Sequence, residues 1–415
     1  MKAQVRLEHE LLAVEGDHEV NAMLELTAPA APASGERPPL SLALVIDRSG
    51  SMAGRKLEVA RECAAFLVRR LGPADRLAVV AYDDQVTLVA PLATLDRPAL
   101  LAAIAAIRPG NSTNLSGGWL KGMEQLQRAG DGPRKVLLLS DGLANVGITD
   151  RGELASLARN AAAAGVGTTT IGFGDGFDED LMTGMADAGG GRAYHAPTAE
   201  QAPGIFAEEF EGLLALVAQN VSVEIRPSGH VEMLGVLNDH PQVAVPGGIQ
   251  VQLGDAFADE TRRVVFALRI PNLGRLGVAR VADLVVRYVS VGGEIGLHEV
   301  TVPVMVNAVT ADEAAQAGPD AEVAEEILIL RAARAQEEAM RLADDGRFDE
   351  AQQRLRGAAG ELREAAPGSA KAAELLEQAA AMDRVMPQVA AAAYGTATRK
   401  QMLYESRNRR QRRTR

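Results

Sequence analysis

Two kinds of hydrophobic pattern divide the first three quarters of the chain. Residues 1–30 and 218–310 alternate polar and apolar positions over short runs, which is typical of half-buried antiparallel strands. Residues 40–215 combine continuous apolar runs with apolar positions spaced every three or four residues. The runs predict central strands of a parallel sheet, and the spacing predicts helices that cover it. We therefore expect an α/β domain with a doubly wound, mainly parallel sheet between two stretches of antiparallel strands.

The strands of residues 1–30 are too few to be stable alone. We infer that they complete a β-sandwich with residues 218–310, so that the α/β domain of residues 40–215 is inserted in that sandwich. Residues 30–39 are rich in Pro, Ala and Gly without periodicity, which indicates a linker into the inserted domain.

Strand and helix patterns alternate within residues 40–215. The expected strands are residues 40–47, 76–82, 135–141, 166–174 and 192–196. A helix is expected after the first strand, with one apolar face packed on the sheet. This face is formed by Leu57, Ala60, Ala64, Leu67 and Leu71. Further helices are expected near residues 97–107, 116–129, 151–164 and 199–217.

The last hundred residues have a helical composition. Residues 311–395 are rich in Ala, Glu, Leu, Gln and Arg, and three helices are expected at about residues 320–344, 348–365 and 369–393. One segment, DDGRFDEAQQRLRGA, resembles a hairpin of a tetratricopeptide-like array, but no second copy follows at that period. We expect a helical region and not a repeat protein.

Composition places the chain among ordinary globular proteins. Hydrophobic residues make up 47% and charged residues 24% of 415 positions, which excludes a wholly disordered chain and a membrane bundle. The first residues carry charges where a secretory signal needs an unbroken apolar run, so we expect a cytoplasmic location. Cys63 is the single cysteine and excludes an internal disulfide or a cysteine-based zinc site.

Charge is distributed unevenly over the sequence. The net charge is −12, yet residues 398–415 hold eight Lys or Arg and one acid, so this stretch carries +7 and the remainder −19. An acidic body argues against a nucleic-acid clamp. The basic tail of residues 396–415 leaves several roles open: contact with nucleic acid, an anionic membrane or an acidic partner, a solvated tail, or docking on the acidic body of its own chain.

Oxygen-bearing side chains follow the predicted strands. The first strand ends in Asp47-Arg48-Ser49-Gly50-Ser51, and loops at the carboxyl ends of such strands form the ligand crevice. Thr113 precedes a predicted helix, and Asp141 ends another apolar strand. Two carboxylates and three hydroxyls are hard oxygen ligands, and a divalent cation held by them keeps a coordination position for water or an outside ligand. This set suits Mg²⁺ better than Ca²⁺ or Zn²⁺.

This motif set resembles the metal-ion-dependent adhesion site (MIDAS) of von Willebrand factor type A (VWA) domains. The resemblance covers roughly residues 40–215 and rests on DxSGS, STNLSGG and LLLSDG, in that order. It implies that Ser49, Ser51 and Thr113 are direct or near-direct metal ligands and that Asp47 and Asp141 often act through water. Mg²⁺ is the implied ion, with Mn²⁺ or Ca²⁺ as alternatives. The stretches VQLGDAFADETRRVVFALRIP and GGGRAYHA also resemble bacterial intracellular members that carry a sandwich and a helical tail.

Three further residues form a candidate rim for the incoming ligand. Arg48 lies at the variable place inside the metal loop, where its guanidinium would meet an acidic ligand. Asp83 ends a neighbouring strand, and Asn114 follows Thr113 directly. These positions are compatible with selection of the ligand at the edge of the site, but a turn is the favoured interpretation of Asp83.

Other candidate residues carry weaker signals. Gly172, Gly174 and Gly176 follow a strand as in a dinucleotide loop, but the acids of residues 178–180 begin the next helix and would repel pyrophosphate. The same acids with Asp175 are also compatible with Ca²⁺ or with a solvated helix start. Trp119 is compatible with a partner surface, but helix packing is the favoured interpretation. Cys63 is interpreted as a small core residue.

The leading functional hypothesis is a non-enzymatic, Mg²⁺-dependent protein-binding module. Its metal would be completed by a Glu or Asp of a protein partner. The alternative, from another class, is an accessory subunit of an AAA-type ATPase in complex remodelling or metal insertion. A metal-dependent hydrolase is disfavoured because the sequence offers no Ser, His and Asp set and no acid pair poised for hydrolysis.

Overall fold

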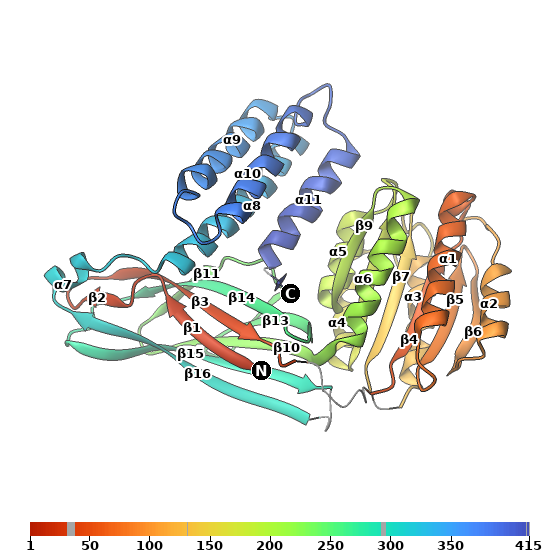
Figure 1. Ribbon diagram of the computed structural model, residues 1–415, viewed down its shortest axis with the longest axis horizontal. Helices are drawn as coiled ribbons and strands as arrows, with labels where there is room; N and C mark the ends of the chain where they lie inside the picture. The colour runs from red at the N-terminus through yellow and green to blue at the C-terminus, as the bar shows by residue number, and fades with distance from the viewer. Residues whose placement is uncertain (31–37, 131, 292–295, 412, 415) are drawn as a thin grey trace.

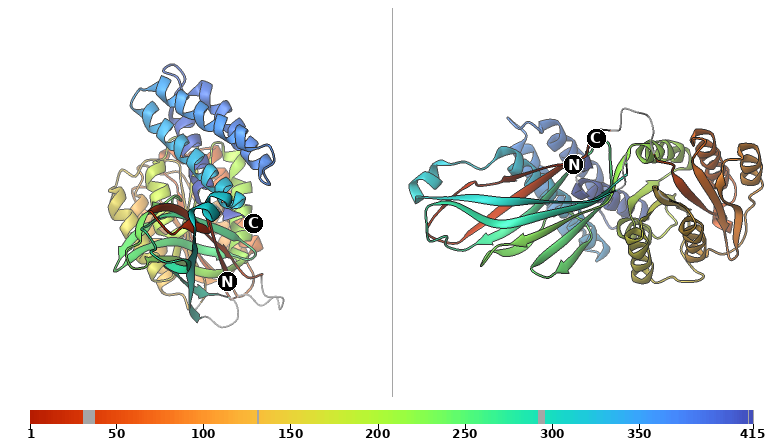
Figure 2. Two further views of the ribbon diagram at one scale, coloured as in Figure 1. Left: turned by 90° about the vertical axis from the view of Figure 1, so that its left-hand side faces the viewer. Right: turned by 90° about the horizontal axis from the view of Figure 1, so that it is seen from below.

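The protein consists of a β-sandwich, an α/β domain and a helical region (Figure 1). The computed structural model describes residues 1–30, 38–130, 132–291, 296–411 and 413–414, and most of the expected linker at residues 30–39 lies outside them. The sandwich and the α/β domain lie at opposite ends of the long axis, and the helical region stands over one face of the sandwich (Figure 2).

Two sheets form the sandwich. One sheet has the order β1-β3-β14-β11, and it contains β1 (Lys2–Leu7), β3 (His18–Thr27), β14 (Thr261–Ile270) and β11 (Glu232–Val236), with β17 (Arg413–Thr414) paired to β14. The other has the order β12-β13-β10-β15-β16-β2, and it contains β12 (Gln242–Val245), β13 (Gly248–Phe257), β10 (Leu216–Pro227), β15 (Gly277–Ser290), β16 (Gly296–Val309) and β2 (Leu11–Ala13). Their facing apolar side chains form one core.

The N-terminal strands belong to this sandwich. β3 pairs antiparallel with β14, with Thr27 opposite Thr261 and His18 opposite Ile270. The chain therefore enters the sandwich, leaves it to form the α/β domain, and returns through β10. The predicted fold class is confirmed. The short strand β2 was not predicted, and it pairs in parallel with the end of β16.

The α/β domain is built on a six-stranded sheet of order β6-β5-β4-β7-β8-β9. Its strands are β6 (Val86–Thr94), β5 (Arg76–Tyr82), β4 (Ser41–Asp47), β7 (Arg134–Ser140), β8 (Val166–Phe173) and β9 (Gly190–Ala196). The strands expected at residues 40–47, 76–82, 135–141, 166–174 and 192–196 all form. The antiparallel edge strand β6 was not predicted, because Pro91 interrupts its apolar residues and they lack strict alternation.

Helices cover both faces of this sheet. The residues of β4 alternate between the two cores: Leu42, Leu44 and Ile46 pack on one side, and Ala43 and Val45 on the other. The first face is covered by α1 (Arg55–Arg70), α2 (Arg97–Ala105) and α6 (Ala202–Leu214), and the second by α3 (Leu115–Gln127), α4 (Arg151–Ala163) and α5 (Glu179–Ala188). A short 3-10 turn, η1 (Gly50–Met52), precedes α1.

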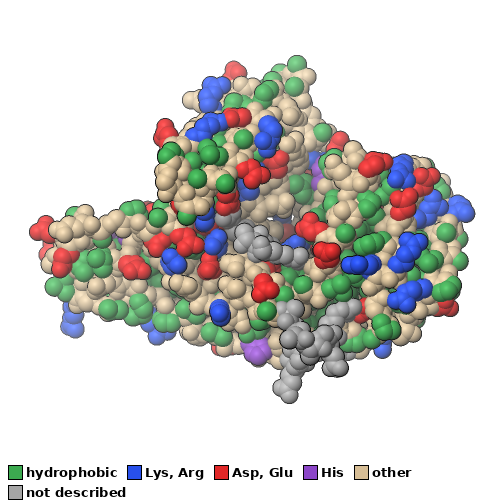
Figure 3. Space-filling view, viewed as in Figure 1, with side chains coloured by type: hydrophobic (Ala, Val, Ile, Leu, Met, Phe, Trp, Pro, Cys, Tyr) green, Lys and Arg blue, Asp and Glu red, His purple; other side chains and the backbone are tan. Residues whose placement is uncertain are grey.

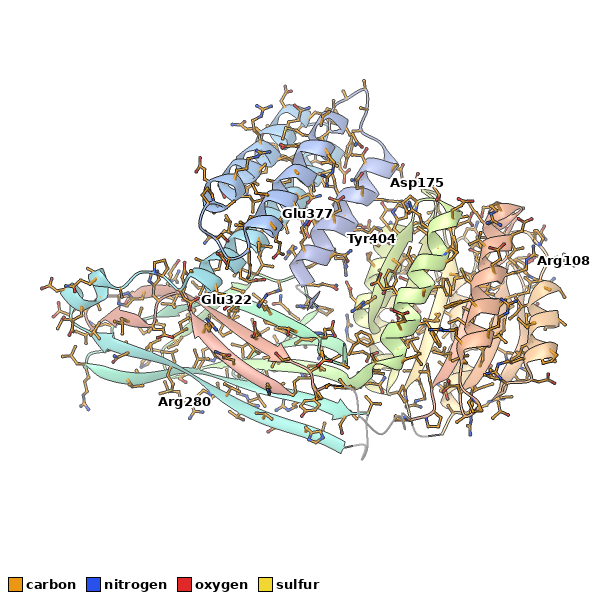
Figure 4. The ribbon with its side chains drawn as sticks, viewed as in Figure 1. Arg108, Asp175, Arg280, Glu322, Glu377 and Tyr404 are labelled. Atoms are coloured by element: carbon orange, nitrogen blue, oxygen red, sulfur yellow. The ribbon has the colours of Figure 1, made fainter. Side chains whose placement is uncertain are left out.

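The strand order places a topological switch point between β4 and β7. From β4 the sheet grows through β5 and β6 in one direction, and through β7, β8 and β9 in the other. Crevices at such switch points, outside the carboxyl ends of the strands, are where open α/β sheets bind ligands. Asp47 ends β4 and Asp141 follows β7, so both carboxylates belong to this crevice. Asp175, two residues after β8, is labelled at the same edge of the sheet in Figure 4.

The helical region follows the sandwich. It contains α7 (Ala311–Gln316), α8 (Ala321–Asp344), α9 (Phe348–Ala365), α10 (Ala372–Val385) and α11 (Thr396–Gln411). Val323, Ile327 and Leu330 of α8 cover Met23 and Val265 on the outer face of the first sandwich sheet. The helices expected at residues 320–344 and 348–365 correspond to α8 and α9, and the one expected at 369–393 is shorter. Among the described residues, no helix is long and apolar enough to cross a membrane.

The basic tail of residues 396–415 forms α11 over most of its length, with Arg412 and Arg415 outside the described residues. This helix lies between the other helices of the region and the α/β domain (Figure 1). Arg399 and Lys400 contact Glu179 of α5, Arg407 contacts Asp187, and Arg410 contacts Glu337 of α8. The cations of this helix are therefore paired with acids of the same chain, which is docking on the acidic body. Its contacts with the α/β domain lie at α5, β9 and the loop after β8.

Candidate functional site

Asp47 lies buried at the base of the candidate site. Its Oδ1 accepts the backbone N–H of Ser49 at 2.8 Å, and its Oδ2 accepts the hydroxyl of Ser140 at 2.6 Å. The side chain is buried at the end of β4. Burial raises the pKa of Asp47 above its ordinary value, although the hydrogen bonds from Ser140 and Ser49 act in the opposite direction. A carboxylate in this position favours a nearby cation.

Ser49, Ser51 and Asp141 form one chain of contacts. The two hydroxyl oxygens lie 3.1 Å apart, and the Ser51 hydroxyl donates to Asp141 Oδ1 at 2.7 Å. Gly50 lies between the serines, and its N–H donates to the carbonyl of Asn111 at 2.8 Å. This bond ties the loop after β4 to the loop before α3. The structure thus brings predicted residues that are ninety positions apart in the sequence within hydrogen-bonding distance.

Thr113 faces the same space from the other side. A Cβ placed on Gly142 would lie 3.4 Å from Ser51 Oγ and 3.4 Å from Thr113 Oγ1, so both hydroxyls point at the backbone just after Asp141. Thr113 is buried, and its N–H donates to Oδ1 of Asn145 at 2.9 Å. The Thr113 carbonyl accepts the N–H groups of Asn145 and Val146. Asn145, which sequence reasoning missed, therefore fastens the Thr113 loop to the loop after β7.

Two glycines let α3 approach the sheet closely enough to deliver Thr113. A Cβ on Gly118 would lie 2.5 Å from the ring of Tyr82, and one on Gly122 would lie 2.7 Å from Val45. Tyr82 is fully buried beneath the site, and its hydroxyl donates to the carbonyl of Leu139 at 3.2 Å. Burial raises the pKa of Tyr82 well above its ordinary value, and the Asp47 carboxylate adds to this. Tyr82 is therefore a neutral packing residue.

The three predicted rim residues have partners within the protein. The Arg48 guanidinium donates to Asp83 Oδ1 at 3.0 Å. Asp83 is buried, which opposes ionisation, but hydrogen bonds from the Gln85 N–H and from Arg48 hold its pKa below the ordinary value. Asn114 is the N-cap of α3, since its Oδ1 accepts the N–H of Gly117 at 2.9 Å. Asp83 and Asn114 organise the loop that carries Thr113, and Arg48 lies at the edge of the crevice.

Lys56 is a second residue that sequence reasoning missed. It lies in the first turn of α1, and its ammonium contacts Asp141 Oδ2. A basic residue at a helix N-terminus opposes the helix dipole, which is the sequence signal that points to a special role. Asp141 therefore has two partners in the structure, the Ser51 hydroxyl on one oxygen and Lys56 on the other.

The residues present fit a hard divalent cation. Asp47, Ser49, Ser51, Thr113 and Asp141 offer only oxygen, which suits Mg²⁺ or Mn²⁺. Within the described ranges, no group of three or more His, Cys, Asp or Glu is arranged to hold a metal ion. A metal site of this chain would thus depend on hydroxyls as well as carboxylates, and the serines and Thr113 at the switch point supply them.

The weaker candidates have structural roles in the described part of the chain. Trp119 is buried, and its indole N–H donates to Thr168 Oγ1 at 3.2 Å. Cys63 is buried in the core under α1, and burial raises the pKa of its thiol to about 12. Asp178 caps α5 and pairs with Arg151, and Asp180 pairs with Arg151 as well.

Sequence comparison identifies the α/β domain. The profile of the von Willebrand factor type A domain matches residues 41–208. An uncharacterised protein of Synechocystis is 28% identical over 57% of this chain and 59% of its own length. The uncharacterised YfbK of Escherichia coli is 27% identical over 57% of this chain and 43% of its own. The E3 ubiquitin-protein ligase WAV3 of Arabidopsis thaliana is 29% identical over 57% of this chain and 32% of its own length. The chain thus spans about a third to three fifths of these relatives.

Two solved structures share the whole architecture. A von Willebrand factor type A protein from Catenulispora acidiphila superposes with a TM-score of 0.76 at 17% identity, over 100% of this chain and 97% of that one. The ArnB paralog VWA2 from Sulfolobus acidocaldarius superposes with a TM-score of 0.64 at 18% identity, over 99% of this chain and 98% of that one. These likenesses establish the fold of sandwich, inserted domain and helices. Residues 41–208 of this chain form a von Willebrand factor type A domain.

Proposed function

We propose that this protein is a Mg²⁺-dependent protein-binding module that recognises a Glu or Asp of a partner. The observation that carries the proposal is the convergence of Ser49, Ser51, Thr113 and Asp141 at the switch point of the sheet, with Asp47 buried beneath them. A bound divalent ion would supply an electrophilic position to which an outside carboxylate adds. The protein's own residues would hold that ion and orient its open side.

The surroundings of the site support an acidic partner. Although the chain carries a net charge of −12, Figure 3 shows several Lys and Arg side chains, interspersed with acids, over the α1 and α2 end of the VWA domain. Arg48, in the loop after β4, and Lys56, in the first turn of α1, lie next to the candidate ligands. An anionic surface approaching this end of an acidic protein would be guided toward the crevice.

Binding of the metal itself is the first experiment. Calorimetric titration with Mn²⁺ and Mg²⁺ would compare the wild type with Asp141→Ala and with Asp84→Ala, which removes an exposed carboxylate in the turn after β5 that is not a candidate ligand. We expect saturable binding in the wild type and in Asp84→Ala, and its loss in Asp141→Ala. Equal binding in all three proteins would contradict the site.

Capture from a native lysate then tests recognition. The wild type in Mg²⁺, the wild type in EDTA and Asp141→Ala in Mg²⁺ would be compared. A partner retained only in the first condition, and lost when its acidic residue is changed to the amide, supports the proposal. Retention of the same proteins in every condition would overturn it. Recovery of an AAA-type ATPase in the first condition would favour the alternative role as an ATPase accessory.

A further inference from the structure

Lys56 is the one basic side chain among the described residues that contacts a candidate metal ligand directly. Its ammonium meets Asp141 Oδ2 from the first turn of α1, while the Ser51 hydroxyl occupies Asp141 Oδ1. The Asp141 side chain is fully buried, whereas the Lys56 side chain is 37% exposed. Lys56 therefore reaches from the rim of the crevice down to a carboxylate at its floor.

The position of Lys56 is unfavourable for a lysine in terms of helix stability alone. A cation in the first turn of a helix is repelled by the positive end of the helix dipole. Gly54, the N-cap of α1, has no side chain to cap the helix, and Glu58 in the same turn pairs with Arg55 at 3.7 Å. The contact with Asp141 offsets this unfavourable interaction with the helix dipole. The presence of a lysine here therefore follows from the candidate site and not from helix stability.

The formal charges around the crevice show what Lys56 contributes. Asp47 and Asp141 bring two negative charges and Lys56 one positive charge, so the site by itself is −1. A divalent ion makes it +1, and one carboxylate from a partner makes it neutral. Arg48 does not change this sum, because it is paired with Asp83 at 3.0 Å. Without Lys56 the metal-loaded site would already be neutral before any ligand arrived.

We propose that Lys56 sets the charge of the site so that its metal-loaded form selects a carboxylate over a neutral oxygen ligand, and that it holds Asp141 in place when no metal is bound. The proposal rests on the function proposed above. It predicts two opposite effects of removing the ammonium. The metal binds more tightly, because a competing cation is gone, and the loaded site loses its preference for an anion.

The test uses Mn²⁺ as the metal and two small probes. Acetate carries the carboxylate, and acetamide is its neutral counterpart of the same shape. Water-proton relaxation of the bound Mn²⁺ reports displacement of its water by either probe. The proteins are the full-length wild type, Lys56→Gln, Lys56→Arg and Lys121→Gln. The last of these removes a lysine on α3 that pairs with Glu124 away from the site.

We expect Lys56→Gln to bind Mn²⁺ roughly tenfold more tightly, the size of effect that a unit charge a few ångströms from a divalent ion has in water. Its preference for acetate over acetamide should fall by a similar factor. Lys56→Arg retains the charge and should keep the acetate preference, and Lys121→Gln should behave as the wild type. In EDTA, Lys56→Gln should melt at a lower temperature than the wild type, and Mn²⁺ should remove that difference.

Each outcome separates the two proposals. If the wild type binds Mn²⁺ and Lys56→Gln has the same metal affinity and acetate preference, the role of Lys56 is overturned while the metal site stands. If the wild type shows no saturable Mn²⁺ binding, the proposed function fails and the role of Lys56 fails with it. If Lys56→Arg loses the acetate preference as completely as Lys56→Gln, shape rather than charge is responsible, and the proposal is overturned.

Discussion

Lys400 of α11 is fully buried against Phe177 of the VWA domain: its ammonium donates to the Phe177 carbonyl at 2.6 Å and lies 3.6 Å from the centroid of the Phe177 ring. Phe177 follows β8 and belongs to the core on the α3, α4 and α5 face. Burial lowers the pKa of Lys400, and the nearby Glu179 carboxylate opposes this. The contact joins the last helix of the chain to the interior of the inserted domain.

Replacement of Lys400 by Met should loosen α11 from the VWA domain. Methionine retains the apolar stem but leaves the Phe177 carbonyl without its donor, at a cost of about 2 kcal/mol. Hydrogen exchange should become faster at residues 175–181 and in the first half of α11. Arg409→Met is the matched control, because Arg409 donates to Gln336 of α8 and not to the VWA domain. Unchanged exchange at residues 175–181 in Lys400→Met would contradict this role.

A second buried contact fixes the VWA domain to the sandwich. Lys135 of β7 donates to Asp255 of β13 at 2.9 Å, and both side chains are buried. Glu209 of α6 lies 3.9 Å from the same ammonium. Lys135→Met should destabilise the protein by about 3–5 kcal/mol, because it leaves a buried carboxylate without its partner. Thermal or urea denaturation measures this loss.

A double-mutant cycle separates the pair from general effects of burial. Asp255→Asn in the Lys135→Met background removes the stranded charge and should recover part of the stability. Strict additivity of the two single changes would show that the two residues are not coupled. Glu124→Gln, an exposed carboxylate change on α3, serves as the control and should alter stability little.

The α/β domain could be predicted from sequence because its signals are local. Continuous apolar runs mark β4, β5, β7 and β8, and the loops that follow two of them carry Asp47 and Asp141. The edge strand β6 could not be predicted in the same way, because Pro91 interrupts its apolar residues and they lack strict alternation. The order of the candidate oxygen ligands along the chain predicts one site, and the structure brings their loops together.

Contacts between distant residues could not be predicted from the same signals. The eight basic residues near the C-terminus suggest a solvated or a ligand-binding tail as readily as a docked helix. The acidic partners of Arg399 and Arg410 lie 55 to 220 positions away in the sequence. Lys56 escaped notice for the same reason, since Asp141 is 85 positions further along. Composition shows that such a segment is positively charged, but only the fold shows which residues it contacts.

Gly118 should be needed for the approach of α3 to the sheet. A Cβ at this position would lie 2.5 Å from the Tyr82 ring, which is fully buried and cannot move aside. We expect Gly118→Ala to destabilise the protein by about 1–3 kcal/mol, in spite of the better helix propensity of alanine. Gly184→Ala in α5 is the control, since a Cβ there meets nothing within 4 Å, and it should be neutral or stabilising. A stabilised Gly118→Ala protein would show that α3 can shift freely.

His195 should make the α11 contact sensitive to acid. Its ring lies 5.4 Å from that of Tyr404 on α11, and Tyr404 is labelled in Figure 4 at the junction with the VWA domain. Burial lowers the pKa of His195, and Lys400 acts in the same direction, whereas the Gly174 carbonyl, Asp175 and Glu179 oppose them. The folded protein therefore binds fewer protons than the unfolded chain when the pH falls through the ordinary pKa of histidine.

The sign of the effect follows from this difference. The stability contributed by neutral His195 is fully present above the ordinary histidine pKa and is lost as the pH falls below it. Between about pH 8 and about pH 5.5, the wild type should lose more thermal stability than His195→Asn, which cannot titrate in this range. His230→Asn changes an exposed histidine and should retain the wild-type dependence. Equal pH dependence in the wild type and His195→Asn would mean that other groups control the acid response of the junction.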